Sequence, residues 1–208
     1  MYLEPTDFAT YKNTIFNAIV APRPIGWIST ISDAGLVNLA PFSYYNGISA
    51  TPPMVMFAGN APEDRGEKDT LANARASGEF VANFVNYDLR ERMNLTSATA
   101  PHGIDEFALA RLTKAPSRKV KPPRVAESPV NLECNVVRII DIEPTGPGER
   151  RSSVVIGRVV ALHIDDRFLD ANGRFDTIKA RPVTRLGGYQ YATFSETFEM
   201  RRPSWPLE

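Results

Sequence analysis

The sequence predicts a mainly β fold with a few short helices, in which an antiparallel sheet closes wholly or partly into a barrel. Two long segments rich in Val and Ile, 130–142 and 153–164, flank the turn-forming run Pro144-Thr145-Gly146-Pro147-Gly148, which is typical of a β-hairpin. The chain also holds 17 Pro and 13 Gly, which favours turns over a helical bundle. Because strands and helices do not alternate regularly, a doubly wound parallel sheet is not expected.

The first half of the chain contains four shorter strand candidates, at 25–31, 36–42, 54–58 and 80–85. The run Asp33-Ala34-Gly35 can turn the chain between the first two. Pro41 confines its strand to a sheet edge or a strand end, since proline cannot donate to a ladder. The continuous apolar run at 54–58 predicts a strand that is buried on both faces.

Two short helices are expected. The first covers 70–77, with Asp69 or Thr70 as its N-cap and Gly78 just beyond its end. The second begins at Asp88, where Asp88-Leu89-Arg90-Glu91 resembles a capping box. From 99 to 128 the chain is polar, Pro-rich and irregular, and no linker divides it, so we expect one domain over residues 1–208.

Composition excludes several classes of protein. Lys and Arg together number 24, as do Asp and Glu, so the net charge of zero gives no overall attraction to nucleic acid or to an anionic membrane. The single cysteine, Cys134, cannot form an intrachain disulfide, and with two histidines the chain cannot assemble a usual Cys/His zinc site. No secretory signal or spanning apolar run is visible, so a soluble cytoplasmic protein is expected.

Familiar catalytic motifs are missing from the sequence. There is no Walker loop and no Gly-x-Gly-x-x-Gly fingerprint. The run Gly47-Ile48-Ser49-Ala50-Thr51 approaches a nucleophile elbow but lacks its second glycine, and a Ser-His-Asp triad would need His102 or His163 as the base. If the protein is an enzyme, we therefore expect an organic cofactor to supply the chemistry.

An ordered series of short motifs runs through most of the chain. It begins with Ala21-Pro22-Arg23-Pro24-Ile25-Gly26-Trp27-Ile28-Ser29-Thr30 and Gly35-Leu36-Val37-Asn38-Leu39-Ala40-Pro41-Phe42-Ser43, and it continues through Lys68-Asp69-Thr70, Asp105-Glu106-Phe107, Leu132-Glu133-Cys134 and Arg185-Leu186-Gly187-Gly188-Tyr189. Each motif is weak alone, but together and in this order they are specific. The chain resembles the flavin reductase-like proteins of the FMN-binding split-barrel group.

This resemblance implies a small antiparallel split barrel, usually a homodimer, with FMN near the subunit interface. It also implies hydride transfer from NADH or NADPH to flavin, with electrons passing to an acceptor, an electron-accepting protein or a monooxygenase partner. Two alternatives stay open: a non-catalytic FMN-binding electron carrier, and a split-barrel dimer that binds another planar ligand such as haem.

The resemblance also implies which residues contact the flavin. Ser29 and Thr30 are candidates for the phosphate or ribityl oxygens, and Asn38 and Ser43 for the pyrimidine edge of the ring. Lys68 and Thr70 stand where a helix begins and could hold a phosphate. The alternative interpretation is that these six residues have ordinary structural roles, as strand formers, turn residues or residues at a helix cap.

Three further residues are weaker candidates. Arg23 could face the phosphate or the N1–C2=O region of the flavin, or pair with a surface carboxylate, and Arg185 precedes two glycines that permit close approach of a ligand. His163 could meet nicotinamide or substrate, although a structural role is favoured. The cations between Arg111 and Arg124 could attract the phosphates of a nicotinamide dinucleotide, although solvated loop cations are more common.

Overall fold

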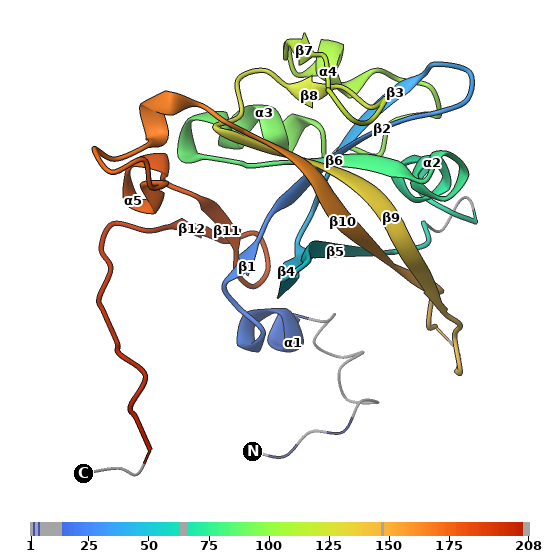
Figure 1. Ribbon diagram of the computed structural model, residues 1–208. Helices are drawn as coiled ribbons and strands as arrows, with labels where there is room; N and C mark the ends of the chain where they lie inside the picture. Colours follow the sequence, from blue (N-terminus) through green and yellow to red (C-terminus); the bar gives the residue numbers. More distant parts are fainter. Residues whose placement is uncertain (1, 3, 5–13, 63–65, 147, 206–208) are drawn as a thin grey trace.

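The computed structural model of the protein describes residues 2, 4, 14–62, 66–146 and 148–205. Its main feature is a seven-stranded antiparallel sheet with the strand order β3-β2-β6-β9-β10-β5-β4, curled into a half-barrel (Figure 1). The strands are β2 (Gly26–Ile31), β3 (Val37–Phe42), β4 (Tyr44–Ala50), β5 (Pro53–Asn60), β6 (Glu79–Asn83), β9 (Val130–Ile142) and β10 (Ser152–Ile164). The mainly β, antiparallel fold class that the sequence predicts is confirmed.

The long hairpin of β9 and β10 is the central pair of this sheet, as the two Val- and Ile-rich segments predict. Its register shifts between Ile156 and Gly157 and again between Val159 and Ala161. Such irregularities increase the local twist of a strand pair and bend it. The hairpin therefore curves, and it brings β5 and β6 onto its two sides.

Three strand predictions meet different outcomes. Pro41 lies in β3, which is an edge strand as expected. Burial along β5 alternates with a period of two, so the prediction of a strand buried on both faces is wrong: Val55 and Phe57 face the core, and Met54 and Met56 are half-buried on the other face. The segment interpreted as a near nucleophile elbow, around Ser49, is instead part of β4 and pairs with β5.

The helices are short and lie around the sheet. They are α1 (Thr14–Ile19), α2 (Asp69–Ser77), η2 (Tyr87–Leu89), α3 (Arg90–Leu95), α4 (Glu106–Leu109), η3 (Asp166–Phe168) and α5 (Thr177–Ala180). Helix α2 ends at Gly78, whose φ of 70° supplies the left-handed C-cap.

Two predicted helix starts are wrong by one or two residues. The N-cap of α2 is Lys68, whose carbonyl accepts from the amides of the first turn, so neither Asp69 nor Thr70 is the cap. The second helical segment starts with η2 and is capped by the side chain of Asn86 rather than by Asp88.

Small sheets and extended segments complete the chain. The strands β1 (Arg23–Pro24), β11 (Val183–Arg185) and β12 (Tyr191–Thr193) form one sheet, and β7 (Lys114–Ala115) pairs with β8 (Arg124–Val125) within the segment expected to be irregular. After β12 the chain leaves the body of the molecule as an extended arm (Figure 1). Among the described residues, no helix combines the length and apolar character needed to span a bilayer.

Two groups of buried apolar side chains form the core. One lies around Trp27, Leu39 and Phe107, between β2, β3 and the helices α3 and α4. The other lies inside the curled sheet, where Phe57 packs against Phe42 and Phe80 with ring centroids 4.9 and 5.1 Å apart. Cys134 belongs to this second group. Burial, with a smaller contribution from Glu133, raises the pKa of its thiol to about 12, and the prediction that this cysteine is buried is confirmed.

Candidate functional site

A cavity of about 690 Å³ opens between the edge strand β3 and the start of α2. Its size lies within the range of roughly 300–1,000 Å³ that is typical of small-molecule and cofactor sites. The segments that line it come from five parts of the chain: β3 to the residues just after β5, the start of α2, the segment after α3, the start of α4, and the β9–β10 turn. The lining includes Asn38, Phe42, Ser43, Lys68, Asp69, Thr70, Thr96–Ala100, Glu106 and Arg150.

A chain of hydrogen bonds fixes the polar wall of this cavity. The hydroxyl of Thr70 donates to Asn38 Oδ1 at 2.6 Å, and Asn38 Nδ2 donates to Glu106 Oε1 at 3.1 Å. The backbone amide of Leu39 donates to the second carboxylate oxygen, Oε2, at 3.0 Å. All three side chains are buried. The amide of Asn38 therefore has one defined orientation, with its oxygen toward α2 and its nitrogen toward α4.

The carboxyl group of Glu106 is the buried end of this chain. Burial raises its pKa, whereas the hydrogen bonds from Leu39 and Asn38 oppose that rise. Both carboxylate oxygens accept a hydrogen bond, an arrangement that suits the ionised form. A buried carboxylate with two fixed donors is costly to place, so its position on the cavity wall points to a role in shaping the site.

Positive charge also lines the cavity. Lys68 caps α2 without a side-chain hydrogen bond to the helix backbone, and its Nζ lies 5.4 Å from the centroid of the Phe42 ring. Arg150 reaches the same cavity from the β9–β10 turn. Asp69 Oδ1 lies 3.1 Å from His102 Nδ1, so this carboxylate is engaged outside the helix N-terminus rather than capping it.

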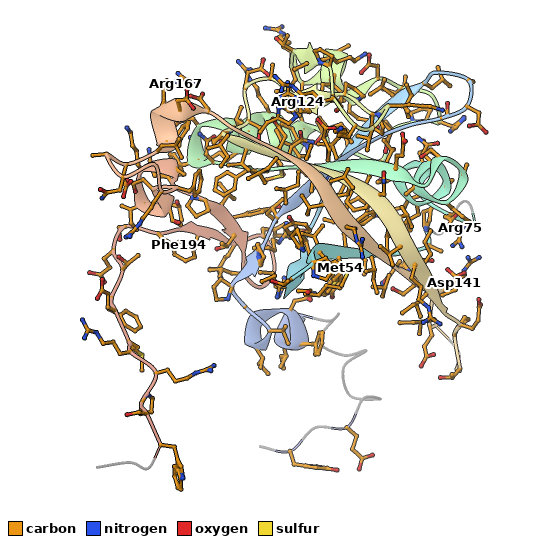
Figure 2. All side chains as sticks on the ribbon, viewed as in Figure 1. Met54, Arg75, Arg124, Asp141, Arg167 and Phe194 are labelled. Atoms are coloured by element: carbon orange, nitrogen blue, oxygen red, sulfur yellow. The ribbon has the colours of Figure 1, made fainter. Side chains whose placement is uncertain are left out.

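An ion-pair network holds the β9–β10 turn against α2. Arg75 Nη2 lies 2.9 Å from Asp141 Oδ1 and 2.9 Å from Glu67 Oε1, and Arg151 Nη2 lies 3.1 Å from the same Asp141 oxygen. Figure 2 shows Arg75 and Asp141 beside each other at this end of the hairpin. Hydrogen bonds from Ser153, Arg75 and Arg151 lower the pKa of Asp141. The network thus fixes the turn that carries Arg150.

Four of the eight predicted flavin contacts meet in this cavity: Asn38, Ser43, Lys68 and Thr70. Ser29 and Thr30 lie behind its wall and are fully buried. Ser29 Oγ donates to the Pro123 carbonyl at 2.6 Å, and Thr30 Oγ1 accepts from Asn73 Nδ2 at 3.2 Å. In this structure the two hydroxyls therefore support neighbouring segments and do not line the cavity.

The remaining predicted residues lie elsewhere. Arg23 is buried and donates to the backbone carbonyls of Asn17, Val20 and Leu186, which ties the segment after α1 to the loop after β11. Arg185 donates to the Tyr191 hydroxyl and the Gly188 carbonyl. His163 lines a separate pocket beside Arg124.

Sequence reasoning did not single out three parts of the cavity wall as site residues. Glu106 stood only within a family motif, Arg150 belongs to a turn, and the segment Thr96–Ala100 carries no motif. A hydrogen bond from Trp27 Nε1 to Thr96 Oγ1, at 2.8 Å, joins that last segment to β2. Within the described ranges, no three His, Cys, Asp or Glu side chains gather in a way that could hold a metal ion.

Comparisons with known proteins agree with this geometry. An uncharacterized protein of Halalkalibacterium halodurans is 40% identical over 206 residues, which cover 98% of this chain and 97% of that one. The crystal structure of nitrilotriacetate monooxygenase component B from Bacillus cereus is similar at 30% identity and a TM-score of 0.88, covering 96% of this chain and 98% of that one.

A putative flavin reductase with a split barrel domain from Shewanella frigidimarina NCIMB 400 shares the fold, at 21% identity and a TM-score of 0.82, covering 97% of this chain and 99% of that one. The half-barrel sheet described above is thus of the split-barrel type. A family model, the flavin reductase like domain, matches residues 20–179. The chain therefore belongs to the flavin reductase-like family.

Proposed function

We propose that the cavity between β3 and α2 binds FMN and that the protein is an oxidoreductase that reduces this flavin with NADH or NADPH. One observation carries the proposal: the hydrogen-bond chain from Thr70 through Asn38 to Glu106 fixes an amide on the wall of a cofactor-sized cavity that also holds cations. Family membership and the similarity to a monooxygenase component support a flavin as the ligand.

The donor set fits the parts of FMN. A phosphate is stabilised by cations and by the positive end of a helix dipole, and the start of the nine-residue helix α2 lies in this cavity beside Lys68 and Thr70, with Arg150 also in the lining. The pyrimidine edge of the flavin carries donors and acceptors, which suit the Asn38 amide and the Ser43 hydroxyl. Phe42 supplies an apolar surface on the same wall.

In this proposal the protein side chains bind and orient rather than react. When bound, the flavin supplies the redox chemistry, accepting a hydride from the reduced nicotinamide and releasing electrons to an acceptor. Hydride transfer depends on the alignment of two rings more than on a proton donor. The role of Glu106 is to hold the Asn38 amide in one orientation, and that of the Arg75–Asp141 pair is to hold the turn that carries Arg150.

Ser29, Thr30, Arg23 and Arg185 stay predicted flavin contacts, although they do not line this cavity. Ser29 and Thr30 support the cavity wall from behind, while Arg23 and Arg185 order the segments around β1 and β11. Four further properties stay predictions: a homodimer, a single domain, a cytoplasmic location, and an electron-accepting or monooxygenase partner. The name of the Bacillus cereus protein, a monooxygenase component, is consistent with a partner of that class.

Anaerobic mixing of the protein, FMN and each nicotinamide in turn tests this function. We expect the yellow colour of the flavin to bleach with NADH or NADPH, and the rate to depend on the protein concentration. Protein that binds FMN but leaves it oxidised with both nicotinamides is an electron carrier. Protein that does not bind FMN contradicts the proposal and favours a different planar ligand.

A further inference from the structure

A second pocket, of about 530 Å³, lies at the other end of the β9–β10 hairpin, between the start of β9, the end of β10 and the loop from 116 to 129. Among the described residues, it shares none of its lining with the cavity beside α2. Three cations line it: Arg118, Lys119 and Arg124. Figure 2 shows Arg124 on the face of the molecule away from β5 and the C-terminal arm.

Arg124 is held in place before any ligand arrives. Its Nε donates to the Pro116 carbonyl at 3.1 Å, and its Nη1 donates to Asn131 Oδ1 at 3.0 Å. Asn131 is itself fixed, because its Nδ2 donates to Asn83 Oδ1 at 2.9 Å and to the Val125 carbonyl at 3.1 Å. A guanidinium positioned in this way loses little conformational entropy when it binds an anion.

Within the described part of the chain, no ion pair joins Arg118 or Arg124 to a carboxylate at 4.0 Å or less. Burial lowers the pKa of Arg124, and the neighbouring charge of Arg118 lowers it further, whereas Glu133 opposes this shift. Asp165 also lines the pocket, but it is paired with Arg167, whose Nη2 lies 2.5 Å from Asp165 Oδ2. The pocket therefore keeps an excess of positive charge that an anion would offset.

His163 also lines this pocket, and a buried carboxylate orients its ring. Glu133 is fully buried and accepts from the backbone amides of Arg118 at 2.8 Å and Lys119 at 2.6 Å. His163 Nε2 lies 2.5 Å from Glu133 Oε1, and the imidazole lines the pocket. The carboxylate thus fixes both the loop that carries two of the cations and the imidazole ring.

We propose that this pocket is a second ligand site, which binds a phosphoryl group through Arg124, Arg118, Lys119 and His163. Guanidinium groups recognise phosphate oxygens by paired, charge-assisted hydrogen bonds, and a lysine adds a point charge. The phosphoryl group can be free or carried by a nucleotide. Among the described residues, this pocket and the flavin cavity share no lining residue, so failure to bind phosphate here would not contradict the proposed function.

Imidazole NMR tests the site directly, because the chain contains only two histidines and a His102→Asn variant assigns both. Inorganic phosphate is titrated at constant ionic strength, with sodium chloride as the reference anion. We expect a saturable shift of the His163 resonances in the wild-type protein, weakened about tenfold or more by Arg124→Gln. Arg138→Gln, an exposed arginine of β9 outside the pocket, is the matched control and leaves the affinity unchanged.

Arg118→Ala is a second variant. It keeps the hydrogen bond to Glu133, because the donor is the backbone amide of Arg118 and not its side chain. It is also expected to weaken phosphate binding. Titration with adenosine 5′-monophosphate and with adenosine separates the sources: tighter binding of the nucleotide than of phosphate indicates a nucleotide-borne group, and equal binding indicates the phosphoryl group alone. The proposal is overturned if no saturable shift occurs, or if both arginine variants bind phosphate as the wild type does.

Discussion

Replacing Glu106 with glutamine is expected to weaken FMN binding by about 10- to 100-fold, which corresponds to about 1.5–3 kcal/mol for hydrogen bonds to a charged group. Both carboxylate oxygens accept a hydrogen bond, from Asn38 Nδ2 and from the Leu39 amide. Glutamine has one oxygen, so its NH₂ group must face one of these donors. The Asn38 amide is then driven to reverse, which also removes the acceptor of the Thr70 hydroxyl.

Quenching of FMN fluorescence on titration with protein measures this effect, with circular dichroism to show that the variant is folded. Glu127→Gln is the matched control, because Glu127 also accepts a backbone amide, that of Thr113, but lies outside the cavity. A folded Glu106→Gln protein with wild-type affinity for FMN would show that the orientation of Asn38 does not matter for binding.

The largest effect on stability is expected at Glu133. Replacing it with alanine leaves His163 and the amides of Arg118 and Lys119 without their acceptor, and each buried donor left without a partner costs about 1–3 kcal/mol. A typical domain is stable by only about 5–15 kcal/mol, so urea denaturation should show a large fall in the midpoint. Glu79→Ala is the control, because Glu79 accepts the Lys121 amide at 2.8 Å but is only half-buried.

The stability difference between the wild type and Glu133→Ala is expected to depend on pH, and the direction of that dependence follows from the pKa of Glu133. Burial opposes ionisation of Glu133 most strongly, but its hydrogen bonds from the Arg118 amide, His163 and the Lys119 amide together hold its pKa below the usual value. Its contribution is therefore present above about pH 4.3, the value for an unfolded glutamate, and is lost as the pH falls through the lower folded pKa. The difference in urea midpoint between the wild type and Glu133→Ala should therefore become smaller at acid pH. Equal midpoints for Glu133→Ala and Glu79→Ala at neutral pH would contradict this account.

The strands that sequence reasoning predicted well are those with dense Val and Ile. The bounds of β9 agree with the prediction, and β10 begins only one residue earlier than expected. Strand β4 was missed because Gly47 and the small polar residues around it lack strand propensity, and because its pairing with β5 decides its structure. Half-burial of β5 could not be predicted from a continuous apolar run, since that pattern does not show which faces neighbouring segments cover.

Half of the predicted flavin contacts meet in one cavity because motif residues on β3 and at the start of α2 are brought together by the Thr70–Asn38 hydrogen bond. Arg150 and Glu106 reach the same cavity from distant parts of the chain, and no local pattern shows such convergence. Arg23, also a predicted flavin contact, lies outside this cavity. Its charge suggested a ligand contact, but its guanidinium donates to backbone carbonyls within the fold.

A crystal structure of the protein grown with FMN tests the central claim most directly. The account predicts the flavin in the cavity between β3 and α2, with its phosphate beside Lys68 and Thr70 and its pyrimidine edge against Asn38. A flavin bound on another surface, or a cavity without flavin in which Asn38 contacts only Thr70 and Glu106, would contradict it.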